Sequence, residues 1–364
     1  ILASSPAGSS VYAATGASLS IASGRLSYVF GLHGPCISFD TACSSSLVAC
    51  HAGLRSEQRG ESRLALIAGV NLTLTPAASI ALAVAGMTSA CGRSHTFDIR
   101  ADGYGRAEAC VAISLRQTSP AAEPVSEQVI LGAGVRQDGR SASLTAPNGL
   151  AQQELVSSAL ADGGVAPSEV ASAEAHGTGT ALGDPIEAGS LCKAVLCRRE
   201  STCRGAVCIG GGKANWGHSE PVAGLSGLLK LAVEMESGLA SPNAHLRVLN
   251  PHVGCALKLT ASLLQVGVSD RGCSQTSSCS GVSSFGYSGT ISHAVLQGHA
   301  NGARRSRTGW SAYTLCRYKR RPFCWMEPAS QPSICAYTLC GLPLHSDRSH
   351  AADVQRRESQ FRTW

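Results

Sequence analysis

Short apolar runs alternate with longer amphipathic segments along most of the chain, from about residue 20 to residue 300. Short apolar runs bounded by glycine or polar residues are typical of buried strands, whereas apolar positions three or four apart are typical of helices. The pattern predicts helices at 44–54, 151–165 and 221–236. It predicts strands at 35–40, 64–70, 109–115, 128–137, 170–177, 205–212 and 280–297. The last three of these segments run into loops or a glycine turn. Strands that alternate with helices indicate a layered α/β protein.

The composition supports a large buried core. Hydrophobic residues make up 44% of the 364 positions and charged residues only 15%, which suits one large domain or two ordinary ones. No apolar run reaches the roughly 18–20 residues that a membrane-spanning helix needs. We therefore expect a soluble protein without a membrane span.

The alternating pattern ends near residue 300. Residues 301–364 are basic and interrupted by proline, with 11 Lys and Arg against 4 Asp and Glu, so this tail carries a net charge of +7. Because the whole chain carries +6, residues 1–300 carry about −1. We expect 301–364 to be a poorly ordered linker or tail. A nucleic-acid-binding protein needs a basic face in its folded body, and the charge balance argues against one.

The sixteen cysteines form no recognisable framework. No Cys-x-x-Cys pair occurs, which argues against a zinc ribbon or a thioredoxin-like centre and predicts no metal site. Most of the cysteines are expected to be small buried side chains in a reducing compartment. The sequence starts with Ile1 rather than Met, so we expect a fragment whose targeting segment is not observable.

One cysteine stands out by its position. In FDTACSSSLVAC, Cys43 lies where a predicted strand passes into a predicted helix. The exposed first turn of a helix offers N–H groups and a positive dipole end, and both favour a thiolate over a thiol. The small side chains of Ser44, Ser45 and Ser46 are expected to leave this turn open. By itself, such a cysteine is more often structural than catalytic.

A second segment, EAHGTGTALGDPIEAG, places His176 at the end of a strand. Glycines on either side of Thr178 give the backbone the freedom to present Thr178 and Thr180, whose hydroxyls suit a polar, extended ligand. A lone histidine is usually structural. Asp184 and Glu187 are expected to anchor the turn and the helix that follows.

A third segment, GGGKANWGHSEPVAG, holds Lys213 and His218. It is not a phosphate-binding loop, because Ala214 stands where that loop requires Ser or Thr. A loop that brings Lys213 and His218 toward one point is the better interpretation. Further along, SSFGYSGT at 283–290 predicts a glycine turn whose N–H groups could form an oxyanion hole. A simple hairpin turn would give the same pattern.

These residues suggest one kind of chemistry when they are taken together. A cysteine protease needs one histidine and an Asn or Asp that orients it. Two histidines and a lysine suit a different task, which is to stabilise an enolate while a carboxylate leaves. A thiolate first accepts an acyl group, and the two imidazoles then polarise the carbonyl of a second thioester.

The motifs, in their order, resemble the β-ketoacyl synthase (ketosynthase) domains of modular type I polyketide synthases. The resemblance covers roughly residues 10–300 and rests on DTACSSSLVA, FDIRADGYGRAEAC, SASLTAPNG, EAHGTGTALGDPIEAG, KANWGHSEPVAG, LNPH and SSFGYSGTISH. It implies a thiolase-like fold, a five-layer α-β-α-β-α sandwich built of two similar halves. The halves would be 1–120, incomplete at its N-terminus, and 121–300, with 301–364 as the basic tail.

The resemblance implies an acyltransferase. The reaction would be a decarboxylative Claisen condensation of a Cys-bound acyl chain with a malonyl-type extender, in polyketide or fatty acid biosynthesis. Cys43 would be the acyl-accepting nucleophile. His176 and His218 would promote decarboxylation and stabilise the enolate, and Lys213 would hold the region of the first histidine through polar contacts.

The same resemblance implies how substrates are held. The N–H groups of Cys43 and Tyr287 would form the oxyanion hole, and Tyr287 with Phe285 would gate the acyl pocket. Thr178 and Thr180 would contact the phosphopantetheine arm of an acyl carrier protein. The enzyme would bind no metal or other cofactor itself, and it would work as a homodimer beside other polyketide synthase domains.

The sequence also departs from the family. Family members begin well before the position of Ile1, so the first half is expected to leave a sheet edge and a core face uncovered. Ile291 replaces an Asn of a structural turn, and Trp216 replaces a smaller apolar residue. The alternatives are a non-catalytic partner of the chain-length-factor kind and an inactive fragment. The expected location is the cytoplasm or a plastid stroma.

Overall fold

The computed structural model describes residues 11–117, 128–199, 206–257 and 279–298, together with the backbone of two short strands at 262–264 and 269–270. The tail predicted at 301–364 lies outside the described residues. All described residues belong to one compact unit, Ile1–Gly302, and the boundary predicted at 120 within it stays a prediction. No described helix is long and apolar enough to cross a membrane.

A mixed six-stranded sheet lies at the centre of the fold, in the order β3-β10-β9-β4-β5-β7. Its strands are β3 (Gln128–Gln137), β4 (Val170–Glu174), β5 (Val207–Gly210), β7 (Ser262–Leu264), β9 (Cys279–Phe285) and β10 (Thr290–Gly298). The neighbours β9, β4, β5 and β7 run parallel, whereas β10 is antiparallel to both β9 and β3. The carboxyl ends of the parallel strands therefore meet at one edge, where α/β proteins bind ligands.

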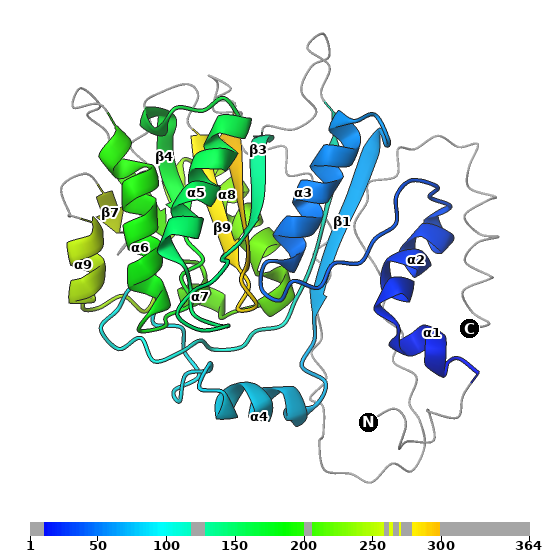
Figure 1. Cartoon of the computed structure of the whole chain (residues 1–364), viewed down its shortest axis with the longest axis horizontal. Coiled ribbons are helices and arrows are strands. Elements are labelled where there is room, and N and C mark those ends of the chain that lie inside the picture. The colour runs from blue at the N-terminus through cyan, green and yellow to red at the C-terminus, as the bar shows by residue number, and fades with distance from the viewer. Residues whose placement is uncertain are drawn as a thin grey trace. The chain divides into compact units, whose positions relative to one another are not determined.

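Helices cover both faces of this sheet (Figure 1). On one face lie α5 (Gly149–Asp162) and α6 (Gly183–Ala194), with α9 (Pro251–Leu257) packed on α6. On the other lie α3 (Ser45–Gln58) and α8 (Ala223–Ser237). A separate hydrophobic cluster fills each of the two spaces between helices and sheet. Strands covered on both faces are apolar at nearly every position, which explains the short apolar runs in the sequence.

A second sheet consists of two antiparallel strands, β1 (Leu64–Asn71) and β2 (Ala109–Arg116). Both α3 and α8 pack against it, so these helices lie between the two sheets (Figure 1). The described layers are therefore helices, six-stranded sheet, helices and two-stranded sheet. They correspond to four of the five layers expected from the sequence.

The other face of this small sheet is uncovered among the described residues. Leu64, Leu66 and Val70 alternate along β1, and they are 55%, 44% and 58% exposed. No side chain is buried in α1 (Ala13–Ala17), α2 (Leu19–Phe30) or α4 (Pro76–Val84). Within the described part of the chain, these apolar side chains of the small sheet are therefore exposed.

The strand predicted at 35–40 is wrong. These residues form no regular secondary structure, and Ile37 is 58% exposed. A strand needs a neighbour that pairs with its N–H and C=O groups, and none of the described sheets pairs with this segment. The other predicted strands and helices are confirmed with boundaries that shift by a few residues. Ile291 is fully buried in β10 rather than part of a turn.

Several shorter elements complete the described fold. They are α7 (Lys213–Trp216), the paired strands β6 (Leu239–Ala240) and β8 (Ser269–Asp270), and the 3-10 turns Pro167–Glu169, Leu196–Arg198 and Glu220–Val222.

Helix α5 approaches β3 closely because two glycines of the strand face it. A Cβ on Gly132 would lie 2.4 Å from the backbone nitrogen of Gly163. A Cβ on Gly134 would lie 3.1 Å from Cδ1 of Leu155, which is fully buried. The helix therefore rests on the strand with no room for larger residues, and Leu155 fills the space between them.

Replacing Leu155 with Ala should lower the free energy of unfolding by about 2–5 kcal/mol, because it opens a cavity beneath α5. The matched control is Leu150→Ala in the same helix. Leu150 is 67% exposed, so its replacement should change the free energy by less than about 0.5 kcal/mol. Urea unfolding followed by circular dichroism measures both variants. Equal losses would contradict this packing of α5 on β3.

Candidate active site

Cys43 lies in a tight turn immediately before α3. Ala42 adopts a left-handed conformation with a φ of 55°, which turns the chain sharply into the helix. Ser44 Oγ donates a hydrogen bond to the carbonyl of Thr41 at 2.9 Å, and Ser45 Oγ donates to that of Ala42 at 2.6 Å. All three serines after Cys43 are buried. They hold the turn together rather than leaving it open, which corrects the expectation from the sequence.

The thiol of Cys43 is protonated in the folded protein. The residue is 7% exposed, and this burial raises the pKa of the thiol to about 12. Lys213 and the backbone N–H groups of Cys43 and Tyr287 lower this pKa, and Glu220 raises it, but burial dominates. The expected exposed turn that favours a thiolate is therefore wrong, because burial outweighs the helix dipole. The two N–H groups lie near the sulfur, and their role as an oxyanion hole stays a prediction.

His218 is fully buried beside Cys43, and its Nε2 lies 3.0 Å from Cys43 Sγ. The backbone of His218 pairs with a neighbouring segment. Its N–H donates to the carbonyl of Gly105 at 2.6 Å, and its carbonyl accepts the N–H of Ala107 at 2.9 Å. The ring of Tyr104 packs edge-on against the imidazole at 4.7 Å between centroids. Backbone and ring are thus both fixed in position.

His176 follows β4 and completes a cluster with the first two residues. The side-chain S and N atoms of Cys43, His176 and His218 all lie within 4.8 Å of one another. The backbone N–H groups of His176 and Gly177 donate to the carboxylate of Glu187 at 2.6 and 2.8 Å. Glu187 was expected to anchor a turn, and the structure shows that this turn carries His176.

The two imidazoles carry their proton on the same ring nitrogen. The N–H of Phe285 donates to Nδ1 of His176, and the N–H of Glu220 donates to Nδ1 of His218, each at 3.3 Å. A neutral imidazole that accepts at Nδ1 carries its proton on Nε2. Burial, and then the charge of Lys213, holds the pKa of both imidazoles well below the ordinary value, so both are neutral. Each ring therefore carries an Nε2–H donor, and that of His218 lies beside the thiol.

The residue types in this cluster are also those that bind zinc. A metal needs the lone pair of each Nε2, and a metal-bound histidine usually donates its other ring N–H to an acceptor. Here the Nδ1 atoms of His176 and His218 face N–H donors instead. This arrangement keeps the protons on Nε2 and opposes metal binding. The residues fit a pair of hydrogen-bond donors better than a metal centre.

Lys213 follows β5 and is 6% exposed. Burial lowers the pKa of its ammonium group, while the nearby carboxylates, Glu174 and Glu187 first, raise it. Lys213 forms no ion pair with a carboxylate among the described residues, and Glu174 pairs with Lys230 at 2.6 Å instead. The charge of Lys213 lowers the pKa of the His176 imidazole, after the larger effect of burial. Glu187 holds the backbone of the His176 loop, and the role of Lys213 there stays a prediction.

Thr178 and Thr180 lie half buried on the loop after His176, with their hydroxyl oxygens 3.3 Å apart. Gly179 between them has a φ of 78°, which a side chain would disfavour. Its N–H donates to the buried carboxylate of Asp184 at 3.1 Å. The loop is thus held from the start of α6. The contact of these threonines with phosphopantetheine stays a prediction.

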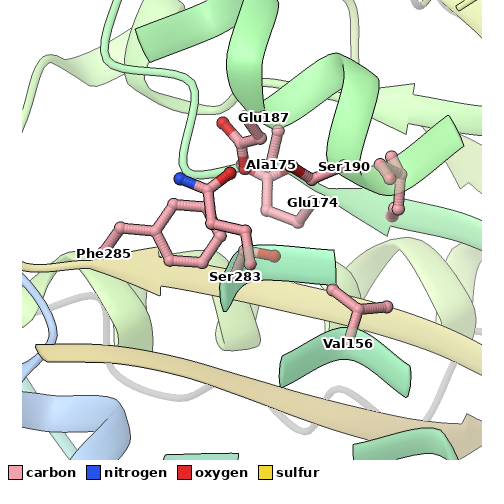
Figure 2. A pocket seen from close by; sticks show the side chains of 10 residues that line it. Val156, Glu174, Ala175, Glu187, Ser190, Ser283 and Phe285 are labelled. Atoms are coloured by element: carbon pink, nitrogen blue, oxygen red, sulfur yellow. The ribbon is translucent and has the colours of Figure 1, made fainter. Parts of the chain in front are cut away.

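The hairpin between β9 and β10 closes one side of the site. The ring of Phe285 lies 5.4 Å from the imidazole of His176 between centroids. Figure 2 shows Phe285 lining a small pocket together with Glu187 and Ser283. This pocket has about 10 Å³, room for one water at most. Of the two predicted gating residues, Phe285 lies beside His176. Tyr287 is 49% exposed and does not line this pocket.

Sequence analysis missed the residues that orient His218. Arg106 forms a two-point ion pair with Glu220, and the N–H of Glu220 is the donor to Nδ1 of the histidine. Glu220 has a φ of 48°, a conformation that this pairing helps to hold. The signal for Tyr104 and Arg106 is the motif FDIRADGYGRAEAC, which contains both residues without indicating a role for either.

Known proteins match the chain over these same residues. The family model described as the β-ketoacyl synthase N-terminal domain matches residues 2–121, and the one for the C-terminal domain matches 128–247. A phenolphthiocerol/phthiocerol polyketide synthase of Mycobacterium tuberculosis is 41% identical over 290 residues, 79% of this chain. An erythronolide synthase of Saccharopolyspora erythraea is 38% identical over 288 residues, also 79% of the chain.

Solved ketosynthase structures share the fold. The oxazolomycin ketosynthase domain of Streptomyces albus matches with a TM-score of 0.72 and 32% identity, over 77% of this chain and 49% of that one. The ketosynthase from module 6 of the bacillaene synthase of Bacillus subtilis matches with a TM-score of 0.72 and 31% identity, over 80% and 53%. These matches confirm the thiolase-like fold. The chain spans about half the length of these structures, 13% of the mycobacterial relative and 8% of the erythronolide synthase.

Glu187 should make the free energy of unfolding fall as the pH rises, a contribution opposite in sign to that of the buried, neutral imidazoles of His176 and His218. Burial raises the pKa of Glu187 to about 7 from an ordinary 4.5. Between these values the folded state binds the proton more tightly than the unfolded state, so rising pH favours unfolding. Glu187→Gln should remove this contribution, so the free energy of unfolding should rise more, or fall less, per pH unit than in the wild-type protein. Urea unfolding between about pH 5 and about pH 7 measures the difference.

The matched control for this variant is Glu154→Gln, because the Glu154 side chain is 66% exposed on α5. Glu154→Gln should show the same dependence of the free energy of unfolding on pH as the wild-type protein. An unaltered pH dependence in Glu187→Gln, or an equal change in both variants, would contradict the burial of the Glu187 carboxyl beneath the His176 loop.

Proposed function

The chain belongs to the β-ketoacyl synthase family, and from this membership we propose that it catalyses a decarboxylative Claisen condensation. A Cys43-bound acyl chain would join a malonyl-type extender on an acyl carrier protein, with loss of carbon dioxide. The observation that carries the proposal is the cluster of Cys43, His176 and His218, with reactive atoms within 4.8 Å of one another. The polyketide synthase relatives favour a polyketide over a fatty acid as product.

The first step transfers the acyl group to Cys43. The sulfur attacks the thioester carbonyl, and the N–H groups of Cys43 and Tyr287 stabilise the negative charge that forms on its oxygen. The carrier thiol leaves and takes up the proton that Cys43 gives up. Because burial keeps Cys43 protonated, proton loss accompanies the attack, and the charge of Lys213 lowers its cost.

The second step uses the two neutral imidazoles. The Nε2–H groups of His176 and His218 donate to the carbonyl oxygen of the malonyl thioester. As the carboxylate leaves as carbon dioxide, its electron pair becomes an enolate that both donors stabilise. The enolate carbon attacks the Cys43 thioester, a carbon–carbon bond forms, and the Cys43 thiolate leaves and is reprotonated. The buried charge of Lys213 favours the negatively charged enolate.

The substrates would arrive on the phosphopantetheine arm of an acyl carrier protein. The half-buried hydroxyls of Thr178 and Thr180, next to His176, suit a polar, extended arm. This chemistry needs no metal or other bound cofactor, because thioester activation and enolate stabilisation both come from side chains and backbone N–H groups. A second copy of the chain and further polyketide synthase domains would be its other partners.

A non-catalytic, chain-length-factor-like partner is less well supported. Such a protein needs no nucleophile, whereas here Cys43 lies in a cluster with both histidines. Backbone N–H donors at Nδ1 leave the ring protons on Nε2, as the proposed condensation requires. The relatives named above are bacterial, which favours the cytoplasm over a plastid stroma as the location.

Cys43→Ala should abolish formation of the acyl-enzyme. The protein is incubated with a radiolabelled acyl thioester and then with malonyl-carrier protein, and bound label and released carbon dioxide are measured. The matched control is Cys50→Ala, because Cys50 is a second buried cysteine, 1% exposed in the helix that follows Cys43, and this variant should keep the label. Wild-type protein that is folded yet neither binds label nor releases carbon dioxide would refute the condensing function.

His176→Ala should slow decarboxylation far more than acylation. The variant loses one of two donors to the enolate oxygen, which typically costs about 100-fold to 1000-fold in rate. Acylation depends on Cys43 and the oxyanion hole, so it should fall by less than about tenfold. Carbon dioxide release and label uptake are measured separately. Equal losses in both steps would contradict the role assigned to His176.

A further inference from the structure

Two cysteines outside the active site lie in contact at the far end of α6. Cys192 is in the last turn of this helix, and Cys197 is in the 3-10 turn Leu196–Arg198 that follows it. Their Sγ atoms are 3.5 Å apart. Cys192 is 3% exposed, whereas Cys197 is exposed to solvent. An accessible thiol thus lies directly over a buried one.

We propose that Cys192 and Cys197 form a reversible disulfide, so that the end of α6 is a redox modification site. A disulfide has an S–S bond of about 2.05 Å, so the sulfurs need to approach by about 1.5 Å. Val195 joins the 3-10 turn to α6, because its N–H donates to the carbonyl of Leu191 in the helix and its carbonyl accepts the N–H of Arg198 in the turn. A small rotation of the exposed Cys197 side chain brings its sulfur closer while the buried partner stays in place.

The oxidant is a small-molecule disulfide such as oxidised glutathione. The Cys197 thiolate, which is accessible, attacks one sulfur of glutathione disulfide, forms a mixed disulfide and releases one glutathione thiolate. The Cys192 thiolate then attacks the Cys197 sulfur, and the second glutathione thiolate leaves. The two cysteines lose two protons and two electrons in all, and one glutathione disulfide becomes two reduced glutathiones. Excess reduced glutathione runs the same steps in reverse.

The disulfide would act on the helix that holds the His176 loop. Asp184 and Glu187 at the start of α6 accept the backbone N–H groups of that loop. At the other end, Arg199 donates to the carbonyl of Val170, the first residue of β4, at 2.7 Å. A bond between Cys192 and Cys197 would fasten α6 to this segment. It would restrain the helix from the end opposite the active site.

Trypsin and mass spectrometry test the proposal directly. Trypsin cuts after Lys193 and places Cys192 in the peptide Ser141–Lys193 and Cys197 in Ala194–Arg198, each with a single cysteine. The full chain is equilibrated in buffers of increasing oxidised-to-reduced glutathione ratio, quenched with acid and digested without reductant. The two peptides should become joined, lighter by two hydrogens than their sum, and should separate again after dithiothreitol.

Two variants and a denatured sample act as controls. Cys197→Ser should abolish the joined peptide, whereas Cys255→Ser, at another exposed cysteine, should leave it unchanged. A sample denatured in concentrated urea should need a higher ratio of oxidised to reduced glutathione, by at least about tenfold, to join the same fraction of the two peptides. The reason is that only the folded protein holds the two thiols together. Recovery of Ala194–Arg198 only as free thiol or glutathione adduct would overturn the proposal. So would equal ratios in folded and denatured protein.

Discussion

The active site depends on keeping two imidazoles neutral with their N–H bonds directed at one point. Burial does this by disfavouring the charged form, and Lys213 adds to it. The N–H groups of Phe285 and Glu220 then decide which ring nitrogen carries the proton. A protonated imidazole would no longer be neutral. An imidazole with its proton on Nδ1 would no longer donate from Nε2. Most other contacts in the site serve this one requirement.

The fold supplies the required positions from separate parts of the chain. The parallel strands β4, β5 and β9 end at one edge of the sheet, and the segments that follow carry His176, Lys213 and the Phe285 turn. Buried carboxylates at the start of α6 hold the backbone of the first of these segments. An ion pair between Arg106 and Glu220 holds the segment of the second histidine. Backbone hydrogen bonds to charged groups thus position most of the side chains that do the chemistry.

The sequence was sufficient to predict which residues come together, because the ordered motifs resemble one family as a set. Each residue taken alone gave only a weak signal. The sequence was not sufficient to predict the environment of these residues. The protonated state of Cys43 depends on burial by segments far along the chain, which no local pattern records. The segment at 35–40 has a strand-like composition but no partner, and strand formation depends on its neighbours as much as on its own residues. Glu187 could be recognised as an anchor, but not as the anchor of His176.

The place of α3 between the two sheets has a consequence for how the nucleophile meets its surroundings. Loops and terminal elements can open locally, whereas an element packed on both sides becomes accessible only when much of the structure unfolds. Cys43 belongs to the turn that starts this enclosed helix, whereas His176 lies on the segment that follows β4. Exposure of the Cys43 sulfur to solvent therefore depends on the free energy of unfolding of the whole domain.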